Sequence, residues 1–261
     1  MSVRWTTAWI TGASSGIGRA LALALALARR GVTVAASARS RDALEGLAAE
    51  AGAEAGNGCA RILPTPLDVT DRDAVKAAAE AAIRVFRGPP DLAVLNAGTY
   101  IPMSAEDFDA ARFRQHVEVN LMGTVHMLDA LLPAYLAARR GHIAIVSSVA
   151  GYRGLPTSAA YGATKAALIN LAESLRYDLD RAGVKLQLVN PGFVKTPLTD
   201  KNDFKMPFLM PVEKAVERMI AGFASSRFEI TFPRRFTWQL KLLRLLPYRL
   251  YFAITRRRTG A

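Results

Sequence analysis

The stretch "TGASSGIG", residues 11–18, places glycines at positions 12, 16 and 18 between an apolar run and a helix-forming segment. The run TTAWI precedes it at residues 6–10, and ALALALALARRG follows at residues 20–31. A strand, a glycine turn and a helix N-terminus bring backbone N–H groups and the positive end of a helix against a pyrophosphate. The stretch therefore predicts a dinucleotide-binding turn. The alternative is a plain glycine- and serine-rich turn.

Alanine and leucine alternate in the segment at residues 20–31, and a period of two is also typical of a strand. Alanine and leucine are strong helix formers, and the segment follows a glycine turn and ends at a glycine. We therefore predict a helix with Gly31 as its C-cap.

Apolar runs and helix-like segments alternate from here to about residue 230. The expected strands are TTAWI (6–10), VTVAAS (32–37), ARILPTPL (60–67), DLAVLN (91–96), HIAIVS (142–147), KLQLVN (185–190) and FEITF (228–232). Further helices are expected at residues 41–51, 71–87, 107–138, 158–181 and 211–225, and a loose surface loop at 50–60. This pattern predicts an α/β fold: a Rossmann-like, doubly wound, seven-stranded parallel sheet with helices on both faces.

The chain has 261 residues, of which 51% are hydrophobic, enough for one large core. We expect one catalytic domain over residues 1–233, extended by a basic amphipathic segment over residues 234–261. The net charge is +12, and eight basic residues but no Asp or Glu lie from residue 230 onward. Such a charge favours nucleic acid or an anionic membrane as a partner, but no nucleic-acid recognition motif is present, so nucleic acid is not expected.

Cysteine and histidine usage gives no sign of a metal site. The single Cys59 excludes an intramolecular disulfide and is expected to be a packed or loop thiol in a reducing compartment. His116, His126 and His142 lack ligand spacing and are expected to be structural or surface residues. The N-terminus lacks a long apolar signal region, so a cytoplasmic location is expected.

The spacing T-G-x-x-x-G-x-G resembles that of the short-chain dehydrogenase/reductase family, and further family motifs follow in order up to about residue 200. They are LDV (67–69), NAG (96–98), Asn120 in VNLMG, SS at 147 and 148, YGATK (161–165) and NPGFVKT (190–196). The resemblance implies an NAD(P)-dependent oxidoreductase acting on CH–OH groups. A regulatory protein that binds the nucleotide without turnover is the alternative, because a fold alone does not establish a function.

Tyr161 and Lys165 are four residues apart and therefore lie on one face of the helix predicted there. A neighbouring ammonium favours the phenolate, so we expect Lys165 to lower the pKa of Tyr161 toward the working pH. A packed tyrosine is the alternative. The resemblance implies that Tyr161 is the acid/base and that Lys165 also binds the nicotinamide ribose.

The resemblance also implies roles for Ser148 and Asn120. Family spacing selects Ser148, thirteen residues before the tyrosine, to bind the reacting oxygen, while its neighbour Ser147 on an extended segment should point to the other side. Asn120 is expected to hold a water or a backbone group beside Lys165, on a proton path to solvent.

The cofactor contacts that the resemblance implies extend over the whole nucleotide. The LDV turn meets the adenine, and the Val194 backbone and Thr196 hydroxyl meet the nicotinamide carboxamide. The full set is Gly12, Ser14, Ser15, Gly16, Ile17, Gly18, Arg39, Asp68, Val69, Asn96, Ala97, Gly98, Tyr161, Lys165, Pro191, Gly192, Val194 and Thr196.

The end of the second predicted strand bears on which nicotinamide is used. Its sequence SARSR has Ala38 where the family's NAD-type aspartate would stand, followed by Arg39, and Arg41 is a second candidate. An arginine attracts a 2′-phosphate and an aspartate repels it, so we expect NADPH to be preferred over NADH. An NADH-preferring dehydrogenase is the alternative.

The segment PLTDKNDFKMPFLMP follows Thr196 and is rich in Phe and Met. In the family this segment is a substrate lid, here at about residues 196–212. Its apolar side chains predict a hydrophobic carbonyl or alcohol substrate, although such residues also fill cores.

The last segment, FTWQLKLLRLLPYRLYFAITRRR at residues 236–258, is interrupted by cations and by Pro247. A transmembrane span is therefore not expected, and two short amphipathic helices are. They suit peripheral contact with an anionic membrane or packing across a subunit boundary. The resemblance implies a homodimer or homotetramer formed through the helices at 107–138 and 158–181.

Overall fold

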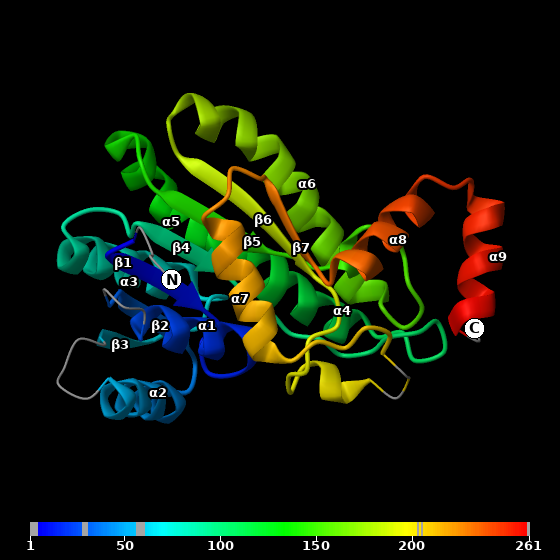
Figure 1. Cartoon of the computed structure of the whole chain (residues 1–261), viewed down its shortest axis with the longest axis horizontal. Helices are drawn as coiled ribbons and strands as arrows, with labels where there is room; N and C mark the ends of the chain where they lie inside the picture. The colour runs from blue at the N-terminus through cyan, green and yellow to red at the C-terminus, as the bar shows by residue number, and fades with distance from the viewer. Residues whose placement is uncertain (1–4, 28–30, 56–60, 203, 205, 260–261) are drawn as a thin grey trace.

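Seven parallel strands form the sheet at the centre of the computed structural model, which describes residues 5–27, 31–55, 61–202, 204 and 206–259. Their order is β3-β2-β1-β4-β5-β6-β7. The strands are β1 (Thr7–Thr11), β2 (Thr33–Ala38), β3 (Arg61–Pro66), β4 (Leu92–Leu95), β5 (His142–Val146), β6 (Lys185–Pro191) and β7 (Glu229–Phe232). All seven predicted strands are present, and the predicted Rossmann-like fold is confirmed (Figure 1).

Helices cover both faces of the sheet, as the alternation predicts. Side chains of α1 (Gly16–Ala26), α2 (Arg41–Glu54) and α7 (Val212–Phe223) share one hydrophobic cluster with Ile10. Those of α3 (Arg72–Phe86), α5 (Gly123–Ala138) and α6 (Ala159–Arg181) share the other with Trp9. Successive strand residues point to opposite faces, so β1, β2, β4, β5 and β6 contribute to both clusters, whereas β3 and β7 contribute to the first only.

The strand order reverses between β1 and β4, which are neighbours in the sheet. At their amino ends the Asp91 carboxylate accepts hydrogen bonds from the N–H groups of Thr6 (2.8 Å) and Thr7 (3.2 Å). At their carboxyl ends the loops after β1 and β4 leave the sheet in opposite directions, which opens the crevice where such folds bind ligands.

Three predicted helix boundaries in the first half are wrong. The first helix begins at Gly16 rather than residue 20, and it ends at Ala26 with Leu27 as its C-cap, so Gly31, whose φ is 59°, does not cap it. Helix α2 continues to Glu54, and the first part of the predicted loop is therefore helical. Cys59 and the rest of that loop lie outside the described residues.

The helix predicted at residues 107–138 is divided into three parts. These are α4 (Ala110–His116), a π-helical segment η1 (Val117–Met122) and α5. Asp109 caps α4 by accepting a hydrogen bond of 2.6 Å from the Arg112 N–H. The π-helical segment holds the fully buried Asn120, whose carbonyl accepts a bond of 3.2 Å from the Thr124 hydroxyl. A π-bulge of this kind is frequent at functional sites.

Ala110–Ala138 is also the one stretch of the described residues that is long and apolar enough to cross a membrane, with a mean hydropathy of 1.3. Core helices pass the same test, and this stretch buries Met127, Leu131 and Tyr135 of α5 against the sheet.

The chain continues after β7 into α8 (Arg234–Arg244) and α9 (Tyr248–Thr259), the two helices predicted on either side of Pro247. Helix α9 lies at the edge of the molecule, away from the sheet (Figure 1). Two 3₁₀ turns, η2 (Val149–Gly151) and η3 (Thr199–Lys201), lie in loops. The division of the chain at residue 233 stays a prediction.

His142 at the start of β5 makes the stability of this fold sensitive to acid. It is 4% exposed and contacts the rings of Trp5 and Phe223. Burial, with the charge of Lys185, lowers the pKa of His142 to about 3, although the nearby Gln187 side chain acts in the opposite direction.

We expect His142→Phe to flatten the loss of stability in acid. The folded pKa lies below the ordinary value of about 6.5, so the wild type loses roughly 1.4 kcal/mol of unfolding free energy per pH unit as the pH falls from 6.5 toward 3. Urea unfolding of both proteins at several pH values measures this. Above about pH 7 the two proteins should show the same pH dependence. If the unfolding free energies of the two proteins fell in parallel below pH 6.5, the acid sensitivity could not be assigned to His142.

Candidate active site

The glycine turn lies at the carboxyl end of β1, where the crevice opens. Gly12 and Gly16 have φ values of 70° and 56°, which other residues rarely adopt. A Cβ atom at Gly18 would lie 2.2 Å from the Gly12 carbonyl oxygen. Within residues 5–27, all of which the structure describes, α1 begins at Gly16. No side chain caps its N-terminus, and its first turn contains no carboxylate. Its N–H groups are therefore free to bind a pyrophosphate, and the turn fits a dinucleotide.

Thr11 and Asn96 join the glycine turn to the turn after β4. The Thr11 hydroxyl accepts hydrogen bonds from the N–H groups of Asn96 (3.0 Å) and Ala97 (3.1 Å). The Asn96 side-chain amide donates to the carbonyls of Thr11 (3.0 Å) and Gly12 (3.3 Å). Asn96 therefore holds the turn in shape from the neighbouring strand.

Asn120 holds the next part of the same loop. Its Oδ1 accepts from the Thr99 N–H at 2.7 Å, and its Nδ2 donates to the Thr99 carbonyl at 3.0 Å and to Thr164 Oγ1 at 3.1 Å. The backbone group expected beside Asn120 is thus that of Thr99. A Cβ atom at Gly98 would lie 3.2 Å from Asn120 Oδ1 and 3.7 Å from Lys165 Nζ, so both side chains border Gly98.

The two adjacent serines have different partners. The Ser147 hydroxyl donates to the Lys165 carbonyl at 2.7 Å, whereas the Ser148 hydroxyl is hydrogen-bonded with Tyr161 and accepts from the Ala150 N–H at 3.1 Å. Lys165 is 3% exposed, its Nζ donates to the Val146 carbonyl at 3.0 Å, and it lies 5.6 Å from the centre of the Tyr161 ring. This geometry favours Ser148 over Ser147 as the residue that works with Tyr161.

The pKa of Tyr161 lies above its ordinary value, the opposite of the direction expected from Lys165. Burial raises the pKa of Tyr161 to about 12, although the hydrogen bond with Ser148 acts to lower it. Burial also lowers the pKa of Lys165 to about 8. The loss of water around both groups therefore outweighs the attraction between ammonium and phenolate, and Tyr161 keeps its proton at neutral pH.

A cavity of about 200 Å³ brings most of the predicted residues together. The predicted residues that line it are Gly12, Ser14, Ser15, Gly16, Ile17, Asn96, Gly98, Ser148, Tyr161, Lys165, Pro191, Gly192, Val194 and Thr196. Six predicted residues do not line it: Gly18, Arg39, Asp68, Val69, Ala97 and Asn120. Gly18, Ala97 and Asn120 support its walls, as the contacts above show, and the other three follow the carboxyl ends of β2 and β3.

Arg39, which follows β2, lies close enough to Asp68, which follows β3, for its positive charge to lower the pKa of the Asp68 carboxyl. Burial acts to raise the pKa of Asp68, but hydrogen bonds from Thr70 and the charge of Arg39 outweigh it, and the pKa is below its ordinary value. Val69 is buried and packs near Gly123, where a Cβ atom would lie 2.5 Å from its Cγ2. Arg41 instead forms an exposed ion pair of 3.7 Å with Glu45 on α2.

The predicted lid is anchored at its base and rich in exposed aromatic rings. The Lys195 N–H donates to the Met210 carbonyl at 2.9 Å, and the Met210 N–H donates to the Phe193 carbonyl at 3.0 Å. The ring of Phe193 contacts those of Phe204 (5.8 Å between centres) and Phe236 on α8 (5.6 Å). The C-terminal extension thus borders the lid.

Sequence reasoning missed several residues around the site. The Tyr100 ring packs edge-on against Tyr161, 5.1 Å between centres, and the Lys201 ammonium donates to the Tyr100 carbonyl at 2.9 Å. Thr164 bonds Asn120 and lies inside the YGATK motif, so the motif itself was a signal for it. Tyr100 and Lys201 carry no such signal in the sequence.

Comparisons with known proteins agree with this geometry. Residues 6–206 match the family described as short chain dehydrogenase. An uncharacterized oxidoreductase of Myxococcus xanthus is 42% identical over 251 residues, which are 96% of this chain and 96% of that protein. A match of this length includes most of residues 234–261. The 3-oxoacyl-acyl-carrier-protein reductase FabG of Thermotoga maritima is 34% identical over 84% of this chain and 82% of its own. The structure of a short chain dehydrogenase from Burkholderia cenocepacia in complex with NADP has a TM-score of 0.81 at 26% identity, covering 98% of this chain and 99% of that one.

We expect Gly18→Ala to weaken dinucleotide binding by about tenfold or more, because the new methyl group would displace the Gly12 carbonyl and deform the turn. Gly46→Ala is the matched control, since nothing lies within 4 Å of its added Cβ atom. Fluorescence titration with NADPH measures both affinities. Equal affinities for the two variants would contradict the role given to this turn.

Proposed function

Since the chain belongs to the short-chain dehydrogenase family, we propose that it is an NADPH-dependent oxidoreductase that interconverts a hydrophobic ketone or aldehyde and the corresponding alcohol. The observation that carries the proposal is that Ser148, Tyr161 and Lys165 line the same cavity as the glycine turn. A proton donor beside a dinucleotide site is what carbonyl reduction requires.

The chain's own residues supply the proton and the orientation of the substrate. When bound, the reduced nicotinamide supplies a hydride to the carbonyl carbon. Tyr161, which burial keeps protonated at neutral pH, donates its proton to the carbonyl oxygen. The Ser148 hydroxyl donates a hydrogen bond to that oxygen and directs it toward Tyr161. In the reverse direction the Tyr161 phenolate accepts the proton of the alcohol, which favours oxidation at high pH.

Lys165 and Asn120 have supporting roles in this mechanism. Lys165 would hold the nicotinamide ribose of a bound cofactor, and its pKa of about 8 lets it exchange protons near neutral pH. Asn120 borders Gly98 together with Lys165 and fixes the Thr99 backbone. We propose that these groups return a proton from solvent to Tyr161.

The preference for NADPH rests on charge at the adenine end. Ala38 at the end of β2 supplies no carboxylate to bind ribose hydroxyls, and the Arg39 guanidinium can bind a 2′-phosphate with paired hydrogen bonds. The complex of the similar Burkholderia protein contains NADP, which supports the same choice.

A hydrophobic substrate is supported by the aromatic residues of the predicted lid, whose first residues, 196–199, line the cavity. Phe204 and Phe208 in the lid are 44% and 46% exposed, and their rings contact Phe193 and Phe236. Exposed apolar side chains in a lid are suited to exclude water around an apolar ligand.

We also propose that the enzyme is a homodimer or homotetramer with contacts through α5 and α6. Leu136 on α5 and Tyr177 on α6 are exposed and would be covered by such contacts. A cytoplasmic location stays a prediction.

Tyr161→Phe should reduce NADPH oxidation with a panel of hydrophobic ketones by about 100-fold to 10,000-fold, since the variant has no proton to donate. NADPH affinity should change little. Tyr177→Phe, which removes the hydroxyl of an exposed tyrosine on the same helix, is the matched control. Turnover equal to that of the control would remove Tyr161 from the mechanism and leave the nucleotide-binding regulatory function in its place.

Arg39→Ala should lower the affinity for NADPH by roughly 10-fold to 100-fold, because the variant loses charge-assisted hydrogen bonds to the 2′-phosphate. The affinity for NADH, which has no 2′-phosphate, should stay constant. Arg41→Ala is the matched control, because Arg41 pairs with Glu45 on the surface of α2. Parallel titrations with both nucleotides measure these affinities. A larger effect at Arg41, or equal losses for both nucleotides, would overturn the role of Arg39.

A further inference from the structure

The C-terminal helices are fixed to the body of the protein by the loop that follows Ser148. Arg153 Nη1 donates to the carbonyls of Leu243 (3.0 Å), Arg244 (3.2 Å) and Leu246 (2.7 Å), where α8 ends. Its guanidinium carbon lies 4.0 Å from the centre of the Tyr251 ring. The same guanidinium carbon lies 4.7 Å from the centre of the Tyr248 ring, so the corner between α8 and α9 is built around two cation–π contacts and three hydrogen bonds.

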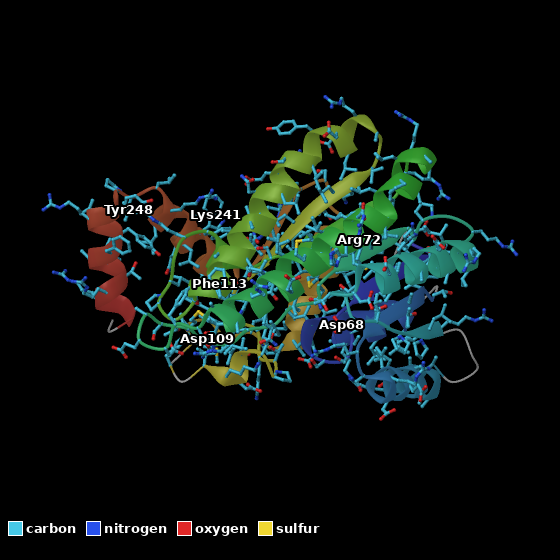
Figure 2. The ribbon with its side chains drawn as sticks, turned by 180° about the vertical axis from the view of Figure 1, so that it is seen from behind. Asp68, Arg72, Asp109, Phe113, Lys241 and Tyr248 are labelled. Atoms are coloured by element: carbon cyan, nitrogen blue, oxygen red, sulfur yellow. The ribbon has the colours of Figure 1, made fainter. Side chains whose placement is uncertain are left out.

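Helix α8 is also held on its inner side. Glu229 of β7 accepts hydrogen bonds from Tyr152, Asn190 and Lys241, the last of which is an ion pair. Figure 2 shows Lys241 on α8, between α9 and the rest of the fold. Phe236 is buried on the same side. Because these contacts fix the inner face, they also fix which side chains of α8 and α9 point outward.

The outward side chains form an apolar stripe. Trp238, Leu242 and Leu245 follow the i, i+4, i+7 spacing of one helix face, and they are 63%, 62% and 80% exposed. The stripe continues at Tyr248, at the start of α9 (Figure 2). The Tyr248 ring stacks on that of Phe252, with 5.9 Å between centres. An amphipathic helix normally buries this face, so the stripe is an interaction surface.

Exposed arginines flank the stripe, and the sequence has no Asp or Glu after Glu229. They are Arg234, Arg235, Arg244, Arg249, Arg256 and Arg257. Two copies of this surface packed on each other would bring these guanidinium groups together, so the charge disfavours a second copy as the occupant. Apolar and aromatic side chains beside arginines instead match the interface of an anionic bilayer, where the charged heads reach the lipid phosphates.

We propose that α8 and α9 form a docking surface for an anionic lipid bilayer, with the stripe Trp238–Leu242–Leu245–Tyr248–Phe252 inserted among the headgroups and the arginines bound to lipid phosphates. The surface is preformed, because Arg153 and Glu229 orient it in the folded chain. The proposal does not depend on the reaction that the enzyme catalyses.

Cosedimentation of the full-length protein with vesicles tests the proposal. The protein should bind phosphatidylcholine vesicles that contain phosphatidylglycerol, bind pure phosphatidylcholine far more weakly, and lose affinity as salt is raised. Leu242→Ser combined with Leu245→Ser should lower binding by about tenfold or more, since both leucines leave the interface. Val85→Ser, an exposed apolar residue on α3, is the matched control and should bind like the wild type.

A charge variant completes the test. Arg249→Glu combined with Arg256→Glu should lower binding several-fold, whereas Arg218→Glu on α7 should not. Circular dichroism and NADPH affinity, measured on the same samples, verify that each variant is folded. Absence of binding to the phosphatidylglycerol vesicles would overturn the proposal. So would an oligomer that dissociates in the double leucine variant, since the stripe would then cover a second copy.

Discussion

The hydrogen bonds that Thr11 and Asn96 exchange at the ends of β1 and β4 are the interaction on which the site depends. They fix the glycine turn against the loop that follows β4. That loop is in turn held by Asn120 through Thr99, and Asn120 bonds Thr164 one residue before Lys165. Lys165 then reaches back to Val146 at the end of β5. Hydrogen bonds and the short chain segments between them thus connect the glycine turn with Lys165.

Much of this arrangement could be predicted because the residues that build it lie in short motifs. The strands were found from apolar runs, and the glycine turn from spacing that only a close backbone approach explains. The π-helical segment at residues 117–122 could not be predicted, since helix periodicity continues through it and only the tertiary contacts of Asn120 select the wider turn. The end of α1 was missed for a similar reason, because the alanine and leucine composition favours helix well beyond Ala26.

The pKa of Tyr161 shows most clearly what a sequence cannot supply. The i, i+4 spacing with Lys165 indicates that the charges are near each other, and it says nothing about how much water either group loses. Desolvation is set by Tyr100, by the sheet and by the loops above them, and it acts on both groups in favour of their neutral forms. The docking of the extension on Tyr152–Gly154 is likewise a contact between segments about ninety residues apart, for which the sequence offers no local signal.

That separation has a consequence for how the protein is made. As the chain is synthesised from its N-terminus, the glycine turn and residues 148–165 emerge long before α8 and α9 exist. The loop after Ser148 obtains the Leu246 carbonyl and the Tyr251 ring only when the last residues are in place, 93 and 98 positions after Arg153. A chain that stops early, or that is clipped near residue 234, would lose the contacts that support the loop beyond Ser148, and also Phe236, whose ring contacts that of Phe193. The loop beyond Ser148 therefore gains its full set of contacts only after the last helix has been synthesised.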